Sequence, residues 1–363
     1  MRAASGVAMG RIIATEGIFS SWRVERLRQI RLAPQRVERN SAATMSADSI
    51  LTSVRQYLEF DPTEKVTLEP IQRGASGRTI VRVKTEEYEP FIGIHWTDER
   101  PDNDFYPAVS HFLEKVGINV ACIMHENLKW RVVLVEDLGD DNLLSLKDEP
   151  WEVREPYYRS IFKQLDKLYY SRHGREVTFS PDFDAAMYRW EQEYFCDHLA
   201  GDLLNVDAGA IRQSADFRAM AERLGSASKH LVHRDFQSQN FMLFDEEAYW
   251  IDFQGMRRGR QEYDLASLIY DPYMDHSKED RERLLDLWED VSEDRPADQM
   301  FQEVAIQRLM QALGAYGNII WNREDEWYKP HVPVAARLLT EVAAGTPYAE
   351  LLEPILEKAM AYR

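Results

Sequence analysis

The 363-residue sequence has few cysteines and no long apolar segment, and each shortage excludes a class of protein. Its two cysteines, Cys122 and Cys196, lie far apart and form no Cys-x-x-Cys or Cys/His cluster. This spacing argues against a zinc site or a disulfide framework and is typical of a reducing compartment. No stretch of about 18 apolar residues is free of charge, as a membrane-spanning helix would require. We therefore expect a soluble, cytoplasmic protein with no membrane partner.

Positive charge is also scarce, because 62 acidic residues stand against 44 Lys and Arg, giving a formal net charge of −18. Nucleic-acid binding draws its affinity from Lys and Arg side chains that neutralise phosphates, so DNA or RNA is not an expected partner. Residues 1–46 are the exception, with eight Arg, three Glu and no Lys or Asp. This basic leader resembles a transit peptide. The interpretation we favour is that Met45 is the true start and that the leader lies outside the fold.

Hydrophobic periodicity predicts an α+β protein in which a strand-rich part precedes a helix-rich part. A helix over 49–60 opens the first part, and short β-branched runs predict strands near 66–68, 79–83, 91–94, 120–123 and 132–135. A helix over 104–116, closed by Gly117, is inserted among them. The small sheet is therefore expected to be antiparallel and to carry one inserted helix.

Helical spacing predominates beyond Gly139. The expected helices are 151–170, 184–199, 215–224, 263–270, 278–288, 301–316 and 332–339. Two strand-like pieces, 241–244 and 248–251, interrupt this pattern and are joined by a tight acidic turn, which predicts a β-hairpin. We expect a break between the two parts near residues 136–139, dividing residues 47–138 from 139–363.

The strongest chemical signal is the segment from His233 to Asn240, which has the form H-R-D-x-x-x-x-N. Phosphoryl transfer needs a carboxylate that accepts the proton of the attacking hydroxyl, and oxygen ligands that hold a metal on the phosphates. Asp235 is the predicted catalytic carboxylate and Asn240 a predicted metal ligand. Asp252 follows twelve positions later, across the expected hairpin, and is the second predicted metal ligand. Each residue alone is ordinary, but their order and spacing are specific.

With these motifs the chain resembles the aminoglycoside phosphotransferase and choline kinase superfamily. The segment 263–268, Tyr-Asp-Leu-Ala-Ser-Leu, is similar to a helix of that family. The resemblance implies a two-lobed protein-kinase-like fold, with a nucleotide-binding N-lobe, and phosphorylation of a small-molecule hydroxyl with ATP and Mg²⁺. It also implies structural roles for His233 and for Asp264, which would brace the catalytic loop. The A-P-E signature of protein kinases is absent, which favours a small-molecule substrate.

Four stretches resemble one branch, the N-acetylmuramate/N-acetylglucosamine anomeric kinases of cell-wall recycling: 133–140, 183–195, 233–270 and 307–316. That resemblance implies an amino sugar phosphorylated at its anomeric hydroxyl. The substrate-binding candidates on the same basis are Arg189, Glu191, Arg234 and Arg308. Charges on helices are more often solvated surface groups, and this alternative remains open for each of them.

Two segments are candidates for nucleotide binding. Glycines between strands let backbone N–H groups approach phosphate oxygens closely. The candidates in the glycine-containing turn are Gly74, Ser76, Gly77 and Arg78. The resemblance further implies that a hinge between the lobes meets the adenine edge with its backbone. The hinge candidates are Glu136, Asp137 and Leu138.

One expected residue is missing, because the strand at 91–96 contains no lysine to bind the α- and β-phosphates. Lys84, His95 and Arg78 are the residues that could take the place of this lysine. The sugar kinases that the chain resembles also lack it. Three alternatives stay open: an aminoglycoside, choline or other small-molecule kinase, a nucleotide-binding pseudokinase, and a protein kinase. The oligomeric state stays open as well.

Overall fold

The computed structural model describes residues 39–71, 77–171, 176–293, 296 and 298–363. The basic leader up to residue 38 and the candidates Gly74 and Ser76 lie outside the described residues. The chain divides into two compact units, Met1–Met45 and Ser46–Arg363, and the second contains every element that bears on the site. None of the described helices is long and apolar enough to cross a lipid bilayer.

The first part of the second unit contains a five-stranded antiparallel sheet in the order β1-β2-β3-β5-β4. Its strands are β1 (Thr67–Pro70), β2 (Arg78–Lys84), β3 (Phe91–Trp96), β4 (Ile123–Asn127) and β5 (Val132–Glu136). The short helix η1 (Pro101–Phe105) and helix α3 (Tyr106–Val116) are inserted between β3 and β4. Gly117 ends α3 with a φ of 82°, as expected. The predicted sheet with one inserted helix is therefore confirmed.

The strand expected at 120–123 was wrong, because β4 begins only at Ile123. Val120 and Ala121 are apolar for another reason: they are buried against the helix-rich part of the unit. Val120 forms an isolated bridge with Trp250, and the Trp250 N–H donates to the Asn119 carbonyl oxygen at 2.8 Å. Burial by a neighbouring segment produced the same sequence pattern as burial within a sheet.

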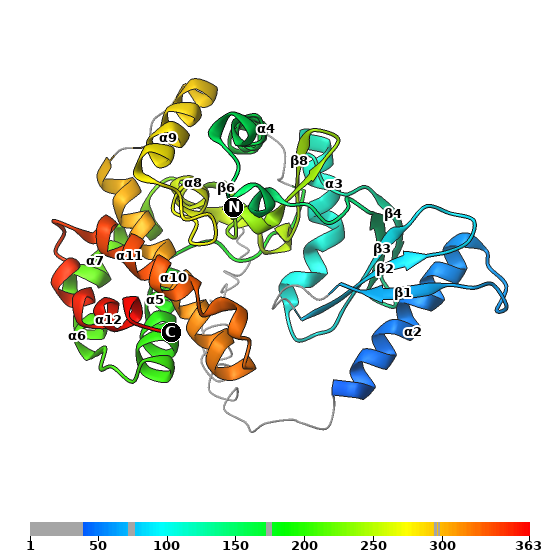
Figure 1. Cartoon of the computed structure of the whole chain (residues 1–363), viewed down its shortest axis with the longest axis horizontal. Coiled ribbons are helices and arrows are strands. Elements are labelled where there is room, and N and C mark those ends of the chain that lie inside the picture. Colours follow the sequence, from blue (N-terminus) through cyan, green and yellow to red (C-terminus); the bar gives the residue numbers. More distant parts are fainter. Residues whose placement is uncertain (1–38, 72–76, 172–175, 294–295, 297) are drawn as a thin grey trace, which may run out of the picture. The chain divides into compact units, whose positions relative to one another are not determined.

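The two faces of the sheet pack against different partners because strand side chains alternate. Val81 and Val83 of β2 pack with Ile50 and Val54 of helix α2 (Arg39–Leu58). The opposite face joins the larger core that includes α3, and Figure 1 shows α2 and α3 on opposite sides of the sheet. Arg78 and Arg82 alternate along β2 with the positions of Val81 and Val83, which face α2. Both arginines therefore lie on the α3 side of the sheet.

Most of the remaining chain is helical. The helices are η2 (Leu143–Leu146), α4 (Trp151–Tyr170), α5 (Ala185–Tyr194), η3 (Phe195–Leu203), α6 (Gly209–Gln213), α7 (Ala215–Ser226), η4 (Ser238–Asn240), η5 (Phe253–Gly255), α8 (Glu262–Ile269), α9 (Lys278–Ser292), α10 (Asp298–Arg323), η6 (Glu326–Tyr328), α11 (His331–Ala343) and α12 (Ala349–Met360). The predicted helix 184–199 is two elements, since η3 is a π-helix. Helix α12 was not predicted, although Leu352, Ile355, Leu356 and Ala359 have helical spacing, because Pro354 lies inside it.

The expected hairpin is present as β7 (Phe241–Phe244) and β8 (Glu247–Trp250), with Phe241 opposite Trp250. Asp245 and Glu246 form its two-residue turn with φ values of 51° and 62°. Positive φ at both positions matches the type I′ turn that suits a twisted hairpin. A second ladder, which was not predicted, pairs β6 (His230–Val232) with β9 (Arg257–Gly259). The two ladders flank the segment that carries the catalytic-loop motif.

Helix α10 packs so closely on η3 that two of its residues have to be glycine. A Cβ on Gly317 would lie 2.5 Å from the carbonyl oxygen of His198, and one on Gly314 would lie 2.9 Å from the backbone nitrogen of Phe195. Both neighbours are backbone atoms, which cannot move aside as a flexible side chain can. These contacts fix the position of α10, which also carries Arg308.

We expect Gly317→Ala to lower the free energy of unfolding by about 1–3 kcal/mol, because overpacking a close contact forces the backbone to shift. Thermal or denaturant unfolding measures the change. Gly201→Ala in η3 is the matched control, since its added Cβ would lie 3.4 Å from the nearest atom on an exposed surface. Equal stability of Gly317→Ala and Gly201→Ala would contradict the packing described here.

Candidate active site

One buried carboxylate, that of Asp264, holds the first part of the catalytic-loop motif in place. Asp264 of α8 accepts hydrogen bonds from the backbone N–H groups of His233, at 2.7 Å, and Arg234, at 2.9 Å. Its side chain is fully buried, and burial raises the pKa of Asp264 to about 7 although these two hydrogen bonds act in the opposite direction. Arg234 has a φ of 81°, a conformation that non-glycine residues rarely adopt and that the two hydrogen bonds stabilise. The contact expected between Asp264 and the loop is present.

A second buried carboxylate, which the sequence analysis missed, holds the other half of the loop. Asp271 accepts a hydrogen bond of 2.7 Å from the Ser238 N–H and is fully buried. Asp264 lies in α8, whereas Asp271 follows the C-cap of that helix, Tyr270. Helical periodicity therefore gave no signal for Asp271.

His233 and three aromatic side chains tie the loop to the hairpin. His233 Nε2 donates to the Ile251 carbonyl oxygen at 3.0 Å, and burial lowers the pKa of His233, which favours the neutral ring. Phe236, Phe241 and Trp250 are fully buried and stack edge to face beneath the loop. His233 is thus a buried contact between the loop and the end of β8.

The hairpin returns Asp252 to Asn240. The pairing of Phe241 with Trp250 continues one step further, where the Ile251 N–H donates to the Asn240 carbonyl oxygen at 3.0 Å. Asn240 Nδ2 donates to the Asp235 carbonyl oxygen at 2.7 Å. The Oδ1 atom of the same side-chain amide therefore points away from that carbonyl oxygen. Asp252 adopts a φ of 62° directly after these contacts. The structure therefore brings the three predicted active-site residues together.

The Asp252 carboxylate is paired with a cation from the sheet. Arg78 Nη2 forms an ion pair with Asp252 Oδ1, and Gln254 Nε2 donates to the same oxygen at 3.1 Å. Burial raises the pKa of Asp252, but the charge of Arg78 and these hydrogen bonds outweigh it, so the pKa lies below its usual value. The carboxylate is therefore ionised at neutral pH.

Asn240 and Asp252 fit a magnesium ion that is also bound to phosphate. Mg²⁺ prefers oxygen ligands and is usually held by one or two carboxylates together with phosphate oxygens and water. Asp252 provides an ionised carboxylate that is 29% exposed, and Asn240 provides an amide oxygen. Within the described ranges, no cluster of three or more His, Cys, Asp and Glu side chains forms a metal site.

Arg308 of α10 lies beside Asp235. Its Nη2 is 4.0 Å from Asp235 Oδ1 and donates to Gln237 Oε1 at 3.2 Å, while its Nε donates to Ser267 Oγ at 2.8 Å. The guanidinium is only 7% exposed. A fixed positive charge thus stands next to the predicted catalytic carboxylate.

Comparison with known proteins agrees with this geometry. The family model described as "Phosphotransferase enzyme family" matches residues 67–301, which is more than half of the chain. The chain belongs to this phosphotransferase family. The catalytic loop, the hairpin and β2 to β5 all lie within the matched region.

Two curated relatives of this phosphotransferase share one name, N-acetylmuramate/N-acetylglucosamine kinase. The protein from Neisseria meningitidis is 24% identical over 64% of this chain and 73% of its own length, and that from Pseudomonas aeruginosa is 25% identical over 70% and 78%. Among solved structures, choline kinase LicA from Streptococcus pneumoniae has a TM-score of 0.59 at 13% identity, covering 82% of this chain and 99% of its own. Amicoumacin kinase hAmiN, bound to AMP-PNP, Ca²⁺ and Ami, also has a TM-score of 0.59, at 12% identity over 85% and 98%. These structures show the bilobal protein-kinase-like fold.

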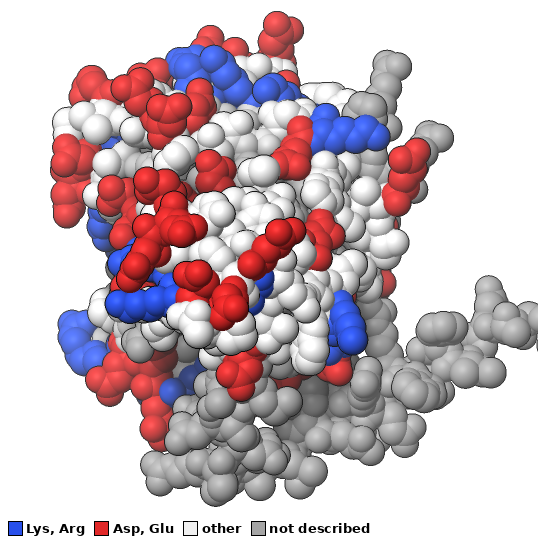
Figure 2. Space-filling model, turned by 90° about the vertical axis from the view of Figure 1, so that its right-hand side faces the viewer, with Lys and Arg blue, Asp and Glu red and all other residues white. Residues whose placement is uncertain are grey.

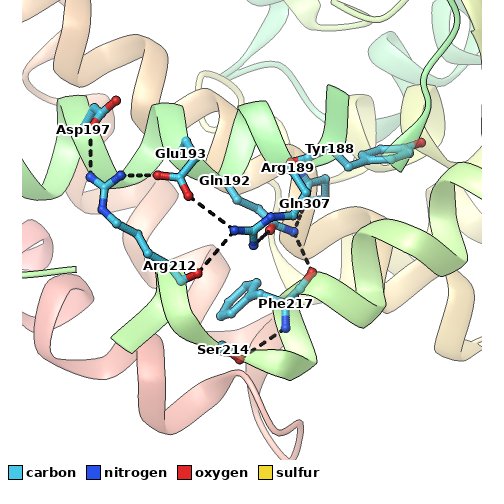
Figure 3. Close-up of polar contacts among 9 residues, drawn as sticks. All are labelled: Tyr188, Arg189, Gln192, Glu193, Asp197, Arg212, Ser214, Phe217 and Gln307. Atoms are coloured by element: carbon cyan, nitrogen blue, oxygen red, sulfur yellow. Dashed lines mark hydrogen bonds and ion pairs between the residues drawn. The ribbon is translucent and has the colours of Figure 1, made fainter. Parts of the chain in front are cut away.

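The substrate candidates on α5 of the phosphotransferase face different surroundings. Glu191 is fully buried and accepts hydrogen bonds from Tyr263 Oη at 2.9 Å and Gln307 Nε2 at 3.0 Å. Arg189 contacts Gln192, Glu193 and the carbonyl oxygen of Arg212, as Figure 3 shows. Residues two apart on a helix do not share a face. Within the described residues, no recorded contact joins Arg189 to the catalytic loop, so the structure does not bring it to the site.

The hinge candidates follow β5. Asp137 accepts hydrogen bonds from Arg82 Nη2 and the Gly139 N–H, both at 3.0 Å, and Leu138 is buried. The Glu136 N–H donates to the Cys122 carbonyl oxygen at 3.0 Å. The Asp137 carboxylate thus braces the hinge against β2, and a backbone contact with adenine remains a prediction. Gly77, with a φ of 68°, directly precedes Arg78.

Lys84 and His95 are two of the three residues that could replace the lysine missing from β3, and their surroundings do not favour that role. Lys84 pairs with Glu69 at 2.8 Å on the surface, where its side chain is 46% exposed. Burial lowers the pKa of His95, so its ring is expected to be neutral. Among these three residues, Arg78 is the one that contacts a predicted metal ligand.

Proposed function

We propose that this phosphotransferase transfers the γ-phosphoryl group of ATP to the anomeric hydroxyl of an amino sugar, N-acetylmuramate or N-acetylglucosamine, in cell-wall recycling. The observation that carries the proposal is that hydrogen bonds join Asn240 both to Asp235 and to Ile251, the residue that directly precedes Asp252. The names of the two curated relatives support the sugar acceptor. The ligands of the amicoumacin kinase structure support a nucleotide and a divalent metal.

In the proposed reaction Asp235 orients the anomeric hydroxyl and accepts its proton. The hydroxyl oxygen forms the new bond to the γ-phosphorus, the bond from that phosphorus to the β,γ-bridging oxygen breaks, and ADP leaves. Mg²⁺ held by Asn240 and Asp252 would offset negative charge on the phosphates. An anomeric hydroxyl is more acidic than an ordinary alcohol, so positioning by the loop contributes more than the basicity of Asp235.

The local charge around Asp235 favours an acceptor that carries a carboxylate. The charges of Arg234, Arg257 and Arg308 interact with that of Asp235, and Arg257 is 3% exposed. The face of the molecule drawn in Figure 2 has the opposite character, since acidic side chains are spread over much of it. A cationic aminoglycoside or choline would suit that surface, whereas N-acetylmuramate suits the arginines.

Arg234 and Arg308 remain the proposed acceptor-binding residues, and Glu191 is a proposed positioning residue. The Arg234 Nε is buried and has no hydrogen-bond partner in the described part of the chain. A buried donor without a partner is costly, and a ligand oxygen would satisfy it. Glu191 would act by holding Tyr263 and Gln307 in place rather than by direct contact.

A panel of acceptors tests the proposal. Purified protein is given ATP and Mg²⁺ with N-acetylmuramate, N-acetylglucosamine, an aminoglycoside or choline, and ADP release is measured. We expect turnover with the two sugars, greater for N-acetylmuramate, and a ³¹P signal coupled to the anomeric proton of the product. Asp235→Asn run in parallel identifies activity from a contaminating kinase. Turnover confined to the aminoglycoside or to choline would refute the sugar acceptor.

A further inference from the structure

The strand β2 presents two arginines toward the catalytic loop side of the sheet, and only one of them is held at the hinge. Arg82 makes a two-pronged contact with Asp137 and a further ion pair with Asp140. Arg78, four residues earlier on the same face, reaches across to the catalytic segment instead. Its side chain is 7% exposed, so it is nearly enclosed beside Asp252.

Arg78, Asp252 and Gln254 form a closed network. Arg78 Nη2 binds Asp252 Oδ1, Arg78 Nη1 donates to Gln254 Oε1 at 3.0 Å, and Gln254 Nε2 donates back to Asp252 Oδ1 at 3.1 Å. The planar guanidinium uses two nitrogens at once, as it does with a phosphate or carboxylate. The network places Arg78, one of the substitutes for the lysine absent from β3, against the carboxylate of Asp252.

The register of the sheet explains how β2 can replace β3. Arg78 lies directly opposite Trp96 at the end of β3, while the β3 residues on the α3 face, Ile92 and Ile94, are buried in the apolar core. A charged group at those β3 positions would lose hydration without a partner in that core. The neighbouring strand supplies the cation at its first residue, where the side chain can leave the core and meet Asp252.

We propose that Arg78 is the phosphate-binding cation of the N-lobe and that, without nucleotide, it occupies the metal-binding carboxylate of Asp252. The inference rests on the proposed function in requiring a metal-bound nucleotide at Asp252. Asp252 and Asn240 would hold the magnesium ion, and its charge would repel the guanidinium, because like charges a few ångströms apart in a partly buried site interact strongly. Arg78 would then release Asp252 and bind phosphate oxygens of the nucleotide, while Gln254 would keep the guanidinium near its original position.

Binding measurements on Arg78→Met test the proposal without using turnover. Isothermal titration with Mg²⁺ and AMP-PNP is compared with titration by adenosine, which has no phosphate. We expect the affinity for Mg²⁺ and AMP-PNP to fall about 10- to 100-fold, the usual effect of losing charge-assisted hydrogen bonds, while that for adenosine stays within about twofold. Arg78→Lys, which keeps one charge but not the fork, should fall between the parent protein and Arg78→Met.

Lys84→Met is the matched control, because it removes a cation from the same strand at a surface ion pair. Its affinities for both ligands should equal those of the parent protein. Equal losses for AMP-PNP and adenosine in Arg78→Met, or no loss for either, would overturn the role of Arg78. A parent protein that bound neither ligand would refute the proposed function itself, so the two failures are distinguishable.

A crystal structure of the parent protein with Mg²⁺ and AMP-PNP provides a test that does not depend on the folding of a variant. The expected result is Arg78 bonded to phosphate oxygens and Asp252 bonded to the metal. Persistence of the ion pair between Arg78 and Asp252 in that complex would overturn the proposal.

Discussion

Asp235→Asn is expected to bind Mg²⁺ and AMP-PNP as tightly as the parent protein and to lose about 10²- to 10⁴-fold in turnover, the usual contribution of general base catalysis. The loop does not depend on the Asp235 carboxylate for its shape. The hydrogen bonds that hold the loop use the backbone groups of His233, Arg234, Asp235 and Ser238. The carboxylate itself is 32% exposed and lies 4.0 Å from Arg308. Asparagine has the same shape but cannot accept the hydroxyl proton at neutral pH.

Steady-state kinetics with N-acetylmuramate, together with titration of the nucleotide, measure the two effects separately. Asp245→Asn is the control, because Asp245 is an exposed carboxylate in the hairpin turn with a φ of 51°. Asparagine tolerates this conformation well, so this variant should keep full turnover. Full turnover in Asp235→Asn would end the catalytic assignment.

Asp252→Asn is expected to remove most of the metal dependence of nucleotide binding and to lower turnover by at least about 10²-fold, since it removes charge stabilisation of the transferring phosphate. In the parent protein, affinity for AMP-PNP should rise markedly when Mg²⁺ is added and fall again with EDTA. The lowered pKa of Asp252 keeps its carboxylate charged throughout the neutral range, and an asparagine oxygen lacks that charge.

The same variant separates the metal site from the phosphate cation. Asp252→Asn removes the charged partner that holds Arg78 in the absence of nucleotide. Metal-free AMP-PNP should therefore bind to Asp252→Asn at least as tightly as to the parent protein, while the gain on adding Mg²⁺ is small. A variant with an undiminished response to Mg²⁺ would show that Asp252 is not a metal ligand.

The chemistry of the site was predictable because it depends on residues close together in sequence. The loop from His233 to Asn240 contains the predicted catalytic carboxylate and one predicted metal ligand within eight positions. A hairpin turn of two residues then determines that Asp252 returns to Asn240, since antiparallel pairing fixes which residues are opposite. The contact of Asp264 with the loop was expected from resemblance, and the structure adds the second brace, Asp271.

The acceptor residues were predicted less well, because periodicity gives a helix but not the direction each side chain faces. Arg189 and Glu191 were proposed together, yet they lie on different faces of α5. Arg308 is the opposite case, a charge on a long helix that would ordinarily be solvated but is enclosed beside Asp235. Its position depends on the close packing of Gly314 and Gly317 against η3, more than a hundred residues away in sequence.

The sequence by itself determined the reaction class, the catalytic loop and the return of Asp252, since local hydrogen bonding and strand alternation act over a few residues. Only the tertiary structure decided which cation meets Asp252 and which charges surround Asp235. Arg78 and Asp252 are 174 positions apart, and the ion pair between them forms only after the sheet has packed on the hairpin. Burial removes most water from Arg78 and part of it from Asp252. Their pairing therefore depends on how separate segments pack and cannot be read from the spacing of residues.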